Sequence, residues 1–173
     1  MRVVLPLLVV AACGGAPSPG AVANSTPAPA PAAPAHEPLA TIERTACHGF
    51  CPIYKVTVFR DGAVDYEGTR FVKTKGPAQG KLGPEQLATL DQLFQSNHYL
   101  GLHDAYEEYK VTDMPSIYTS YVPAGGKAKA VRHYLGDRSA PSELTAVEQG
   151  IDRIVDIEHW IGSDEERRAL PRD

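Results

Sequence analysis

The sequence predicts an α+β domain: an antiparallel sheet of about four strands with two helices packed on one face, in the order ββαββα. Two observations lead to this prediction. Short segments rich in strand-forming residues come in pairs around glycine-containing turns, and each pair precedes a segment with the apolar spacing of a helix. Strands joined by tight turns pair antiparallel, and the helices that follow can cover one face of the sheet.

The first strand pair is predicted around a turn at Asp61-Gly62. Residues 54–59 alternate with the period of two that is typical of a half-buried strand. Asp-Gly is a turn signal because glycine adopts a positive φ without a steric penalty. Residues 63–67 and 70–74 are expected to return as a strand interrupted by Gly68.

A helix, a second strand pair and a second helix are predicted next. Pro84 opens the first helix, in which leucine and phenylalanine recur on one side. The second strand pair is expected over residues 116–122 and 128–135, around a Gly-Gly turn. Pro141 opens the second helix, whose apolar stripe ends at Trp160-Ile161.

The composition excludes several classes of protein. The chain has 173 residues, with 17 Lys and Arg against 21 Asp and Glu, so it lacks the basic excess that nucleic-acid binding by charge requires. Hydrophobic residues make up 43% and charged residues 22%, as in soluble globular proteins. A multi-domain machine, a membrane channel and a nucleic-acid-binding protein are therefore not expected.

Residues 1–12 are predicted to be a lipoprotein signal peptide. A positive charge at Arg2 precedes an apolar run that is too short to span a bilayer but suits a signal-peptide core. The small residues directly before Cys13 resemble the bacterial lipobox, where the cysteine is acylated and the chain is cut before it. A plain secretory peptide with an incidental cysteine is the alternative.

Lipidation of Cys13 predicts where the protein is found and what it contacts. Several acyl chains hold a protein at a membrane far more firmly than one chain does. The expected location is therefore the bacterial cell envelope, with the membrane as a partner through the lipid anchor. Gly14 follows the cysteine where an Asp would indicate inner-membrane retention, which favours the outer membrane.

The rest of the chain is expected to have three parts. Residues 13–38 hold seven of the 15 prolines and many alanines, a composition that favours an extended tether. Residues 39–162 are predicted to form a single α+β domain. Residues 163–173 are predicted to be a charged, frayed tail.

The globular part resembles an uncharacterised bacterial domain family of unknown function. Residues 42–47 and 51–55 are similar to its opening motif, Cys-x-Gly-x-Cys-Pro-x-Tyr. Residues 61–68 resemble a second landmark and residues 112–116 a third, and a closing helix that ends in Trp160-Ile161 fits as well. The resemblance implies that members often follow lipoprotein signals, and it implies no activity.

Cys47 and Cys51 are predicted to form a disulfide. With Cys13 acylated they are the remaining cysteines, and an exported pair most simply pairs with itself. Because a disulfide needs Cα atoms within about 7 Å, the residues between the cysteines must turn. Thiol-redox or copper chemistry at the Cys-x-x-x-Cys pair, with His48 as a further ligand, is the alternative.

Three other residues are singled out without a catalytic assignment. His48, Asp113 and Ser116 are the candidate functional loop residues. A third, hydrolase-like function would use Asp113 and Ser116 with His133, although no Gly-x-Ser-x-Gly elbow supports it. No catalytic residue, metal site or cofactor is assigned.

The function expected from the sequence is that of a lipid-anchored, non-enzymatic binding module. The chain has eight tyrosines, and tyrosine is common at protein interfaces because it joins a large apolar ring to a polar hydroxyl. A tyrosine-bearing sheet face opposite the helices is the expected surface for a partner, a protein of the cell envelope.

Overall fold

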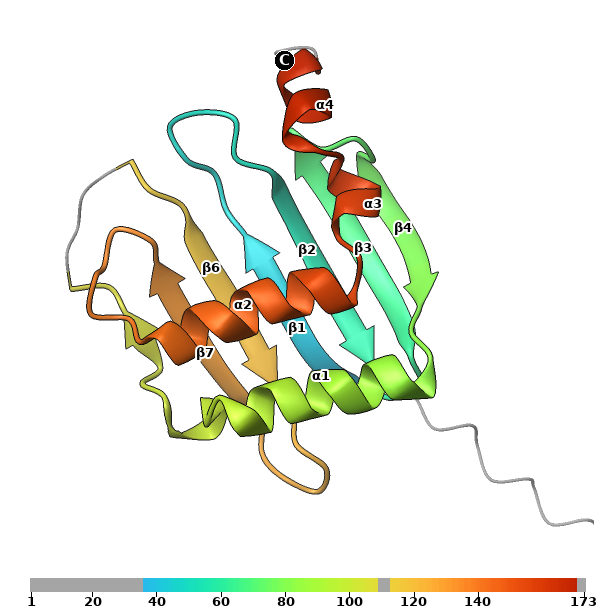
Figure 1. Cartoon of the computed structure of the whole chain (residues 1–173), viewed down its shortest axis with the longest axis vertical. Coiled ribbons are helices and arrows are strands. Elements are labelled where there is room, and N and C mark those ends of the chain that lie inside the picture. Colours follow the sequence, from blue (N-terminus) through green and yellow to red (C-terminus); the bar gives the residue numbers. More distant parts are fainter. Residues whose placement is uncertain (1–35, 109–112, 171–173) are drawn as a thin grey trace, which may run out of the picture. The chain divides into compact units, whose positions relative to one another are not determined.

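The computed structural model describes residues 36–108 and 113–170, which form a twisted sheet with helices on one face (Figure 1). The strands are β1 (Pro38–Arg44), β2 (Ile53–Phe59), β3 (Ala63–Arg70), β4 (Gly76–Lys81), β5 (Ala105–Tyr106), β6 (Ser116–Tyr121) and β7 (Lys129–Tyr134). The helices are α1 (Pro84–Ser96), the 3-10 helix η1 (Tyr99–Gly101), α2 (Ser142–Ile154), α3 (Glu158–Ile161) and α4 (Asp164–Ala169).

The predicted fold class was wrong in the number of strands and in the element order. Within the described residues the sheet has seven strands, in the order β4-β3-β2-β1-β6-β7-β5. Neighbouring strands pair antiparallel except β5 and β7, which pair parallel, so the sheet is mixed. Four strands rather than two precede α1, and α3 and α4 follow α2.

The strands that the sequence analysis missed are β1, β4 and β5. β1 is central, since it pairs with β2 on one side and with β6 on the other, and Ala40 and Ile42 are buried. β4 has the sequence GPAQGK, and its proline and glycines are rare within central strands but are tolerated at an edge. β5 is only two residues long.

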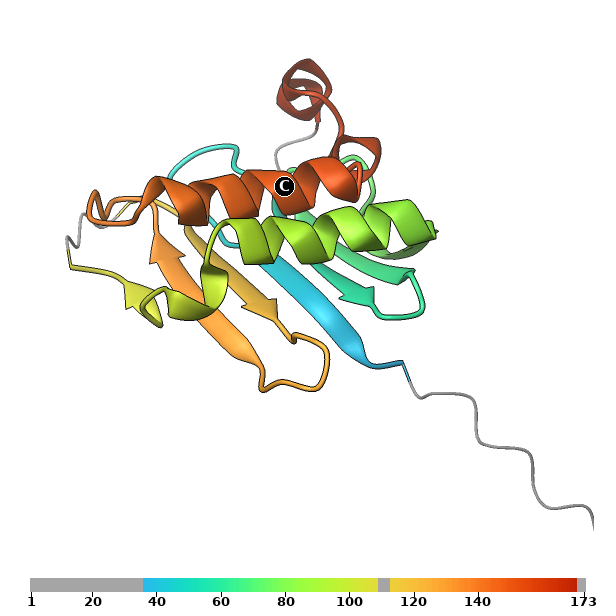
Figure 2. The ribbon, with the colours of Figure 1, turned by 60° about the horizontal axis from the view of Figure 1, so that its bottom comes forward.

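The core lies between the sheet and the two long helices, α1 and α2, which run side by side across one face (Figure 2). Phe94 of α1 stacks on Tyr121 of β6 with ring centroids 4.3 Å apart. Trp160 of α3 stacks on Tyr66 with centroids 5.0 Å apart and lies over β4. A Cβ at Gly80 would come within 3.0 Å of the Trp160 ring, which explains the glycine in this strand.

The sheet face opposite the helices is polar and charged. Glu43 at its centre pairs in register with Lys55 on one side and with Tyr118 on the other. The same row continues to Glu67 beyond Lys55 and to Arg132 beyond Tyr118, so charges of opposite sign alternate over part of it.

The expected tyrosine-bearing face opposite the helices is therefore wrong. Tyr54, Tyr66 and Tyr121 are at most 2% exposed and point toward the helices, in the core. They alternate along their strands with the polar residues of the opposite face, and the apolar ring is what makes them suitable for the buried side. Tyr118 remains on the polar face, 37% exposed.

The C-terminal segment forms a short helix. The Ser163 hydroxyl accepts a hydrogen bond from the Glu166 N–H, and the Glu166 carboxylate accepts one from the Ser163 N–H at 2.8 Å, so α4 begins with a capping box. None of the helices in the described residues is both long enough and apolar enough to cross a membrane. Cys13, the signal peptide and residues 13–35 of the tether lie outside the described residues.

Candidate functional site

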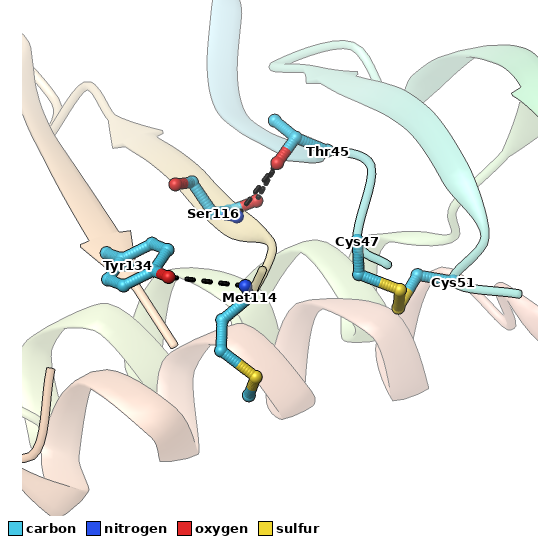
Figure 3. Close-up of a disulfide and its surroundings, with 6 residues drawn as sticks. All are labelled: Thr45, Cys47, Cys51, Met114, Ser116 and Tyr134. Atoms are coloured by element: carbon cyan, nitrogen blue, oxygen red, sulfur yellow. Dashed lines mark hydrogen bonds between the residues drawn. A yellow bond between two sulfur atoms is a disulfide. The ribbon is translucent and has the colours of Figure 1, made fainter. Parts of the chain in front are cut away.

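Two loops meet at the end of the sheet where β1 ends and β6 begins, and we call residues 45–52 and 113–115 together the disulfide end (Figure 3). Cys47 and Cys51 form a disulfide with Cα atoms 5.8 Å apart, which confirms the predicted pairing. The chain turns between them at Gly49, whose N–H donates to the Cys47 carbonyl. Its φ of +155° is one that glycine adopts readily.

The structure joins two of the three candidate loop residues, His48 and Asp113, through their backbones, and Ser116 bonds to Thr45 instead. The His48 N–H donates to the Asp113 carbonyl at 3.2 Å. The Thr45 hydroxyl accepts from the Ser116 N–H at 2.8 Å, and the Thr45 N–H donates to the Ser116 carbonyl at 3.0 Å. Figure 3 also shows the Met114 N–H donating to the Tyr134 hydroxyl. The His48–Asp113 bond joins the two loops, while the other bonds fix them to β6 and β7.

The structure does not assemble the hydrolase-like trio. His133 pairs in register with Ile117 and shares its face of the sheet, so Ser116, the next residue along β6, points to the other face. His133 is 5% exposed, and its Nδ1 lies 2.8 Å from Oε1 of Glu148 on α2. His133 therefore packs in the core and is not at the disulfide end.

Behind the disulfide end, a cluster of three polar residues joins the sheet to α2. The Arg44 guanidinium donates to Oδ2 of Asp152, at 2.6 Å from one nitrogen and 3.1 Å from another. The Tyr54 hydroxyl donates to Oδ1 of Asp152 at 2.7 Å and accepts from Nε of Arg44 at 2.9 Å. Every pair in the cluster is hydrogen-bonded, and the Arg44 and Asp152 side chains are only 20% and 16% exposed.

The electrostatics of this cluster favour its charged form. Burial by itself lowers the pKa of the Arg44 guanidinium, but the charge and hydrogen bonds of Asp152 outweigh it and raise the pKa above its ordinary value. Burial raises the pKa of the Tyr54 hydroxyl, and the charge of Asp152 raises it further. The arginine therefore remains a cation and the tyrosine a neutral donor at neutral pH.

A pocket of about 220 Å³, here called the disulfide pocket, lies beside this cluster. Cys51 contributes to its wall, so the disulfide and the ion pair border the same space. The pocket is smaller than the roughly 300–1,000 Å³ typical of sites for drug-sized ligands and cofactors. Its lining residues are Arg44, Thr45, Cys51, Pro52, Tyr54, Pro115, Ser116, Ile117, Leu135, Asp152, Ile157 and Ile161.

The loops of the disulfide end carry two large exposed apolar side chains. Phe50 is 45% exposed and Met114 is 46% exposed. Phe50 packs edge-on against Phe71 of the β3–β4 loop with ring centroids 5.3 Å apart, and the Arg70 guanidinium lies over the Phe71 ring. Phe50 and Met114 are the large apolar side chains that the loops of the disulfide end expose to solvent.

The chemistry open to this end of the molecule is limited. The two sulfur atoms are bonded to each other. In this state the pair has no thiolate that could bind copper and no free thiol that could take part in thiol–disulfide exchange. Among the described residues, no group of three or more His, Cys, Asp or Glu side chains could hold a metal ion. An apolar pocket with a neutralised ion pair at its edge is suited to receiving an uncharged group.

Sequence reasoning missed the residues that shape this pocket. Arg44 and Asp152 are 108 positions apart, and nothing local links them. Phe50 and Met114, which lie on the adjoining loops and do not line the pocket, were passed over because exposed apolar residues cannot be recognised before the fold is known.

Two comparisons with known proteins bear on this chain. Residues 38–155 match a family described as a domain of unknown function, DUF6438. The match spans the whole sheet with α1 and α2 and ends before α3. No curated protein matches the chain.

Proposed function

This chain belongs to the DUF6438 family, and from that premise we propose that it is a lipid-anchored, non-enzymatic binding module of the bacterial cell envelope. Its partner-binding surface is the disulfide end. The occupant of the disulfide pocket is an uncharged apolar side chain on the surface of an envelope protein.

The sequence supports the anchor and the location. An apolar run ends in small residues directly before Cys13, which is the pattern that lipidation requires. The Cys47–Cys51 disulfide suits an oxidising compartment outside the cytosol, where such bonds persist. The anchor would be in the outer membrane, because Gly14 is not the residue that indicates retention in the inner membrane.

The direction of β1 supports the choice of surface. β1 begins at Pro38, where the chain enters the domain, and ends at Arg44 beside the disulfide loop. A strand rises about 3.3 Å per residue, so these two ends of the sheet are roughly 20 Å apart. If the chain is anchored through its N-terminus, the start of β1 is the end nearer to the anchor in sequence. The disulfide end, where β1 finishes, is then farther along the chain from the anchor.

The observation that carries the proposal is the combination of Phe50 and Met114 with the small pocket. Binding energy at protein interfaces concentrates in a few large side chains around well-packed pockets. Asp152 already neutralises Arg44, so a charged group entering the pocket would lose its hydration without gaining a counter-ion. An apolar side chain loses little on entry and gains burial.

The anchor is tested by replacing the lipidated cysteine. We expect Cys13→Ala to abolish incorporation of a clickable palmitate analogue and to move the chain from the membrane fraction to the soluble fraction. A control chain with Cys47→Ala and Cys51→Ala should keep the label, because it keeps Cys13. Membrane association and labelling that survive Cys13→Ala would contradict the lipid anchor.

The binding surface is tested by photo-crosslinking in the bacterium that makes the protein. We expect Phe50→p-benzoylphenylalanine and Met114→p-benzoylphenylalanine to give the same discrete adduct on irradiation. Gln92→p-benzoylphenylalanine, at an exposed position of α1, should give none. Adducts that also form at Gln92, or no adduct from either loop, would contradict a partner at the disulfide end.

A further inference from the structure

A second, larger pocket lies at the opposite end of the sheet from the disulfide. It has a volume of about 620 Å³ and is bordered by the C-terminal half of α1, by η1 and by the end of β6. Figures 1 and 2 show that end of α1 beside the β6–β7 end of the sheet. We call it the helix-end pocket, and it shares no lining residue with the disulfide pocket.

Buried aromatic rings lie behind the helix-end pocket and pack against one another. Phe94 stacks on Tyr121, and Tyr99 meets Phe94 edge-on with centroids 4.9 Å apart. The outer border is also apolar, since Leu100 is 54% exposed and Pro123 lines the pocket near the β6–β7 turn. A ligand with an apolar body would therefore find apolar surface on several sides.

Asp91 supplies the one carboxylate among the lining residues, beside the polar side chains of Gln95 and His98, and neutral groups hold it. The Tyr121 hydroxyl donates to Oδ1 of Asp91 at 2.5 Å, and the Gln95 side-chain amide donates to Oδ2. These two donors orient the carboxylate without cancelling its charge. Burial, with the hydrogen bond and charge of Asp91, raises the pKa of Tyr121 to about 12, so its hydroxyl remains a donor at neutral pH.

Arg60, the cation whose charge acts on the Tyr121 hydroxyl, is already bound to other groups. The Arg60 guanidinium opposes the rise in the pKa of Tyr121, but it donates to the Val122 carbonyl and lies 3.4 Å from the Glu37 carboxylate. Asp91 thus remains available to a cation that enters the pocket. Each carboxylate oxygen can accept more than one hydrogen bond, so the two existing donors leave capacity for a ligand.

We propose that the helix-end pocket binds a primary ammonium group carried on a short alkyl chain. The ammonium donates to the Asp91 carboxylate, and the alkyl chain packs against Leu100 and Pro123, in front of aromatic rings that are themselves at most 2% exposed. Charge-assisted hydrogen bonds are roughly twice as strong as neutral ones, so the pocket should bind an ammonium group in preference to an uncharged group of the same size. An anionic ligand would face Asp91 with the same sign of charge.

The test compares three ligands of equal length and different charge. Pentylammonium, pentanol and pentanoate are titrated into the full ¹⁵N-labelled chain, with Cys13→Ala to keep it free of lipid, and amide shifts are followed by NMR. We expect pentylammonium to shift Gln95, His98 and Leu100 and to bind at least about tenfold more tightly than pentanol, with pentanoate weakest. Equal affinities for pentylammonium and pentanol, shifts elsewhere, or no shift would overturn the proposal.

Two variants test whether Asp91 is the residue that recognises the charge of the ligand. We expect Asp91→Asn to remove the preference for pentylammonium over pentanol, while Glu85→Gln, an exposed acid on the same helix, keeps it. A preference that survives Asp91→Asn overturns the assignment. The comparison of ligands on the unmodified pocket remains decisive if Asp91→Asn does not fold.

A further ligand identifies the natural source of the ammonium group. Nα-acetyl-lysine amide presents it as a lysine side chain of a protein would, and pentylammonium presents it as a free amine. Tighter binding of the lysine derivative supports a protein lysine, and tighter binding of pentylammonium supports a free amine. Neither result depends on the lipid anchor or on the disulfide end, so this site and the proposed function can fail separately.

Discussion

Replacing Glu148 with alanine is expected to lower the free energy of unfolding by about 4 kcal/mol, because it leaves a cavity and a buried polar nitrogen without its partner. Glu148 and His133 have side chains that are 2% and 6% exposed, and they lie 2.8 Å apart between α2 and β7. In the variant, His133 would have to keep a buried polar nitrogen without that partner, beside a new cavity.

Urea denaturation followed by circular dichroism measures this loss. Gln149→Ala, at the next and exposed position of α2, is the matched control and should change stability by less than about 0.5 kcal/mol. Glu148→Gln keeps the shape and one hydrogen bond, so its loss should be clearly smaller than that of the alanine variant. A Glu148→Ala chain as stable as the control would contradict a structural role for the pair.

Replacing Asp152 with alanine is expected to have the next largest effect, a loss of about 3 kcal/mol, near the lower end for a broken buried pair. We expect a loss of stability near the lower end of this range because the Arg44 and Asp152 side chains are 20% and 16% exposed. Water can therefore partly solvate the arginine that remains. The Tyr54 hydroxyl loses its acceptor in the same change, which adds to the cost.

A double-mutant cycle separates the ion pair from simple packing. Arg44→Met combined with Asp152→Leu replaces both charges with apolar groups, and buried pairs exchanged in this way often retain their stability. We therefore expect the double variant to be more stable than either Arg44→Met or Asp152→Leu alone, with Arg153→Ala, exposed and adjacent, as control. Additive losses for the two charges would show that they do not act as a pair.

The elements that sequence reasoning predicted share a strong local signal. β2, β6, β7 and α1 lie where the alternation or the helical spacing placed them, within a few residues. β3 differs from its prediction because it runs through Gly68 without a break and ends at Arg70 instead of continuing to residue 74. The helix expected to end at Trp160-Ile161 is divided into α2, which ends at Ile154, and α3. Asp61-Gly62 does turn, with the Gly62 N–H bonded to the Phe59 carbonyl. Such signals come from contiguous residues, so they can be recognised before the fold is known.

The elements that it missed depend on partners distant in sequence. Gly80 is accommodated in β4 because β4 pairs with β3 and because Trp160 occupies the space that a side chain at Gly80 would take. β1 is a strand between β2 and β6, and its pairing with β6 joins residues far apart in the chain, such as Ile42 and Thr119. Propensity is overridden in both strands by tertiary pairing.

The sequence by itself determined the disulfide pairing, the regular elements with strong periodicity and the membership of a domain family of unknown function. Only the tertiary structure decided which residues border the two pockets, that Arg44 meets Asp152, and that His133 faces Glu148 in the core instead of Ser116. The physical reason is the distance along the chain over which each kind of interaction acts. Turn chemistry and periodicity act between neighbours in the chain, whereas pockets and buried charge pairs form only where folding brings distant segments together.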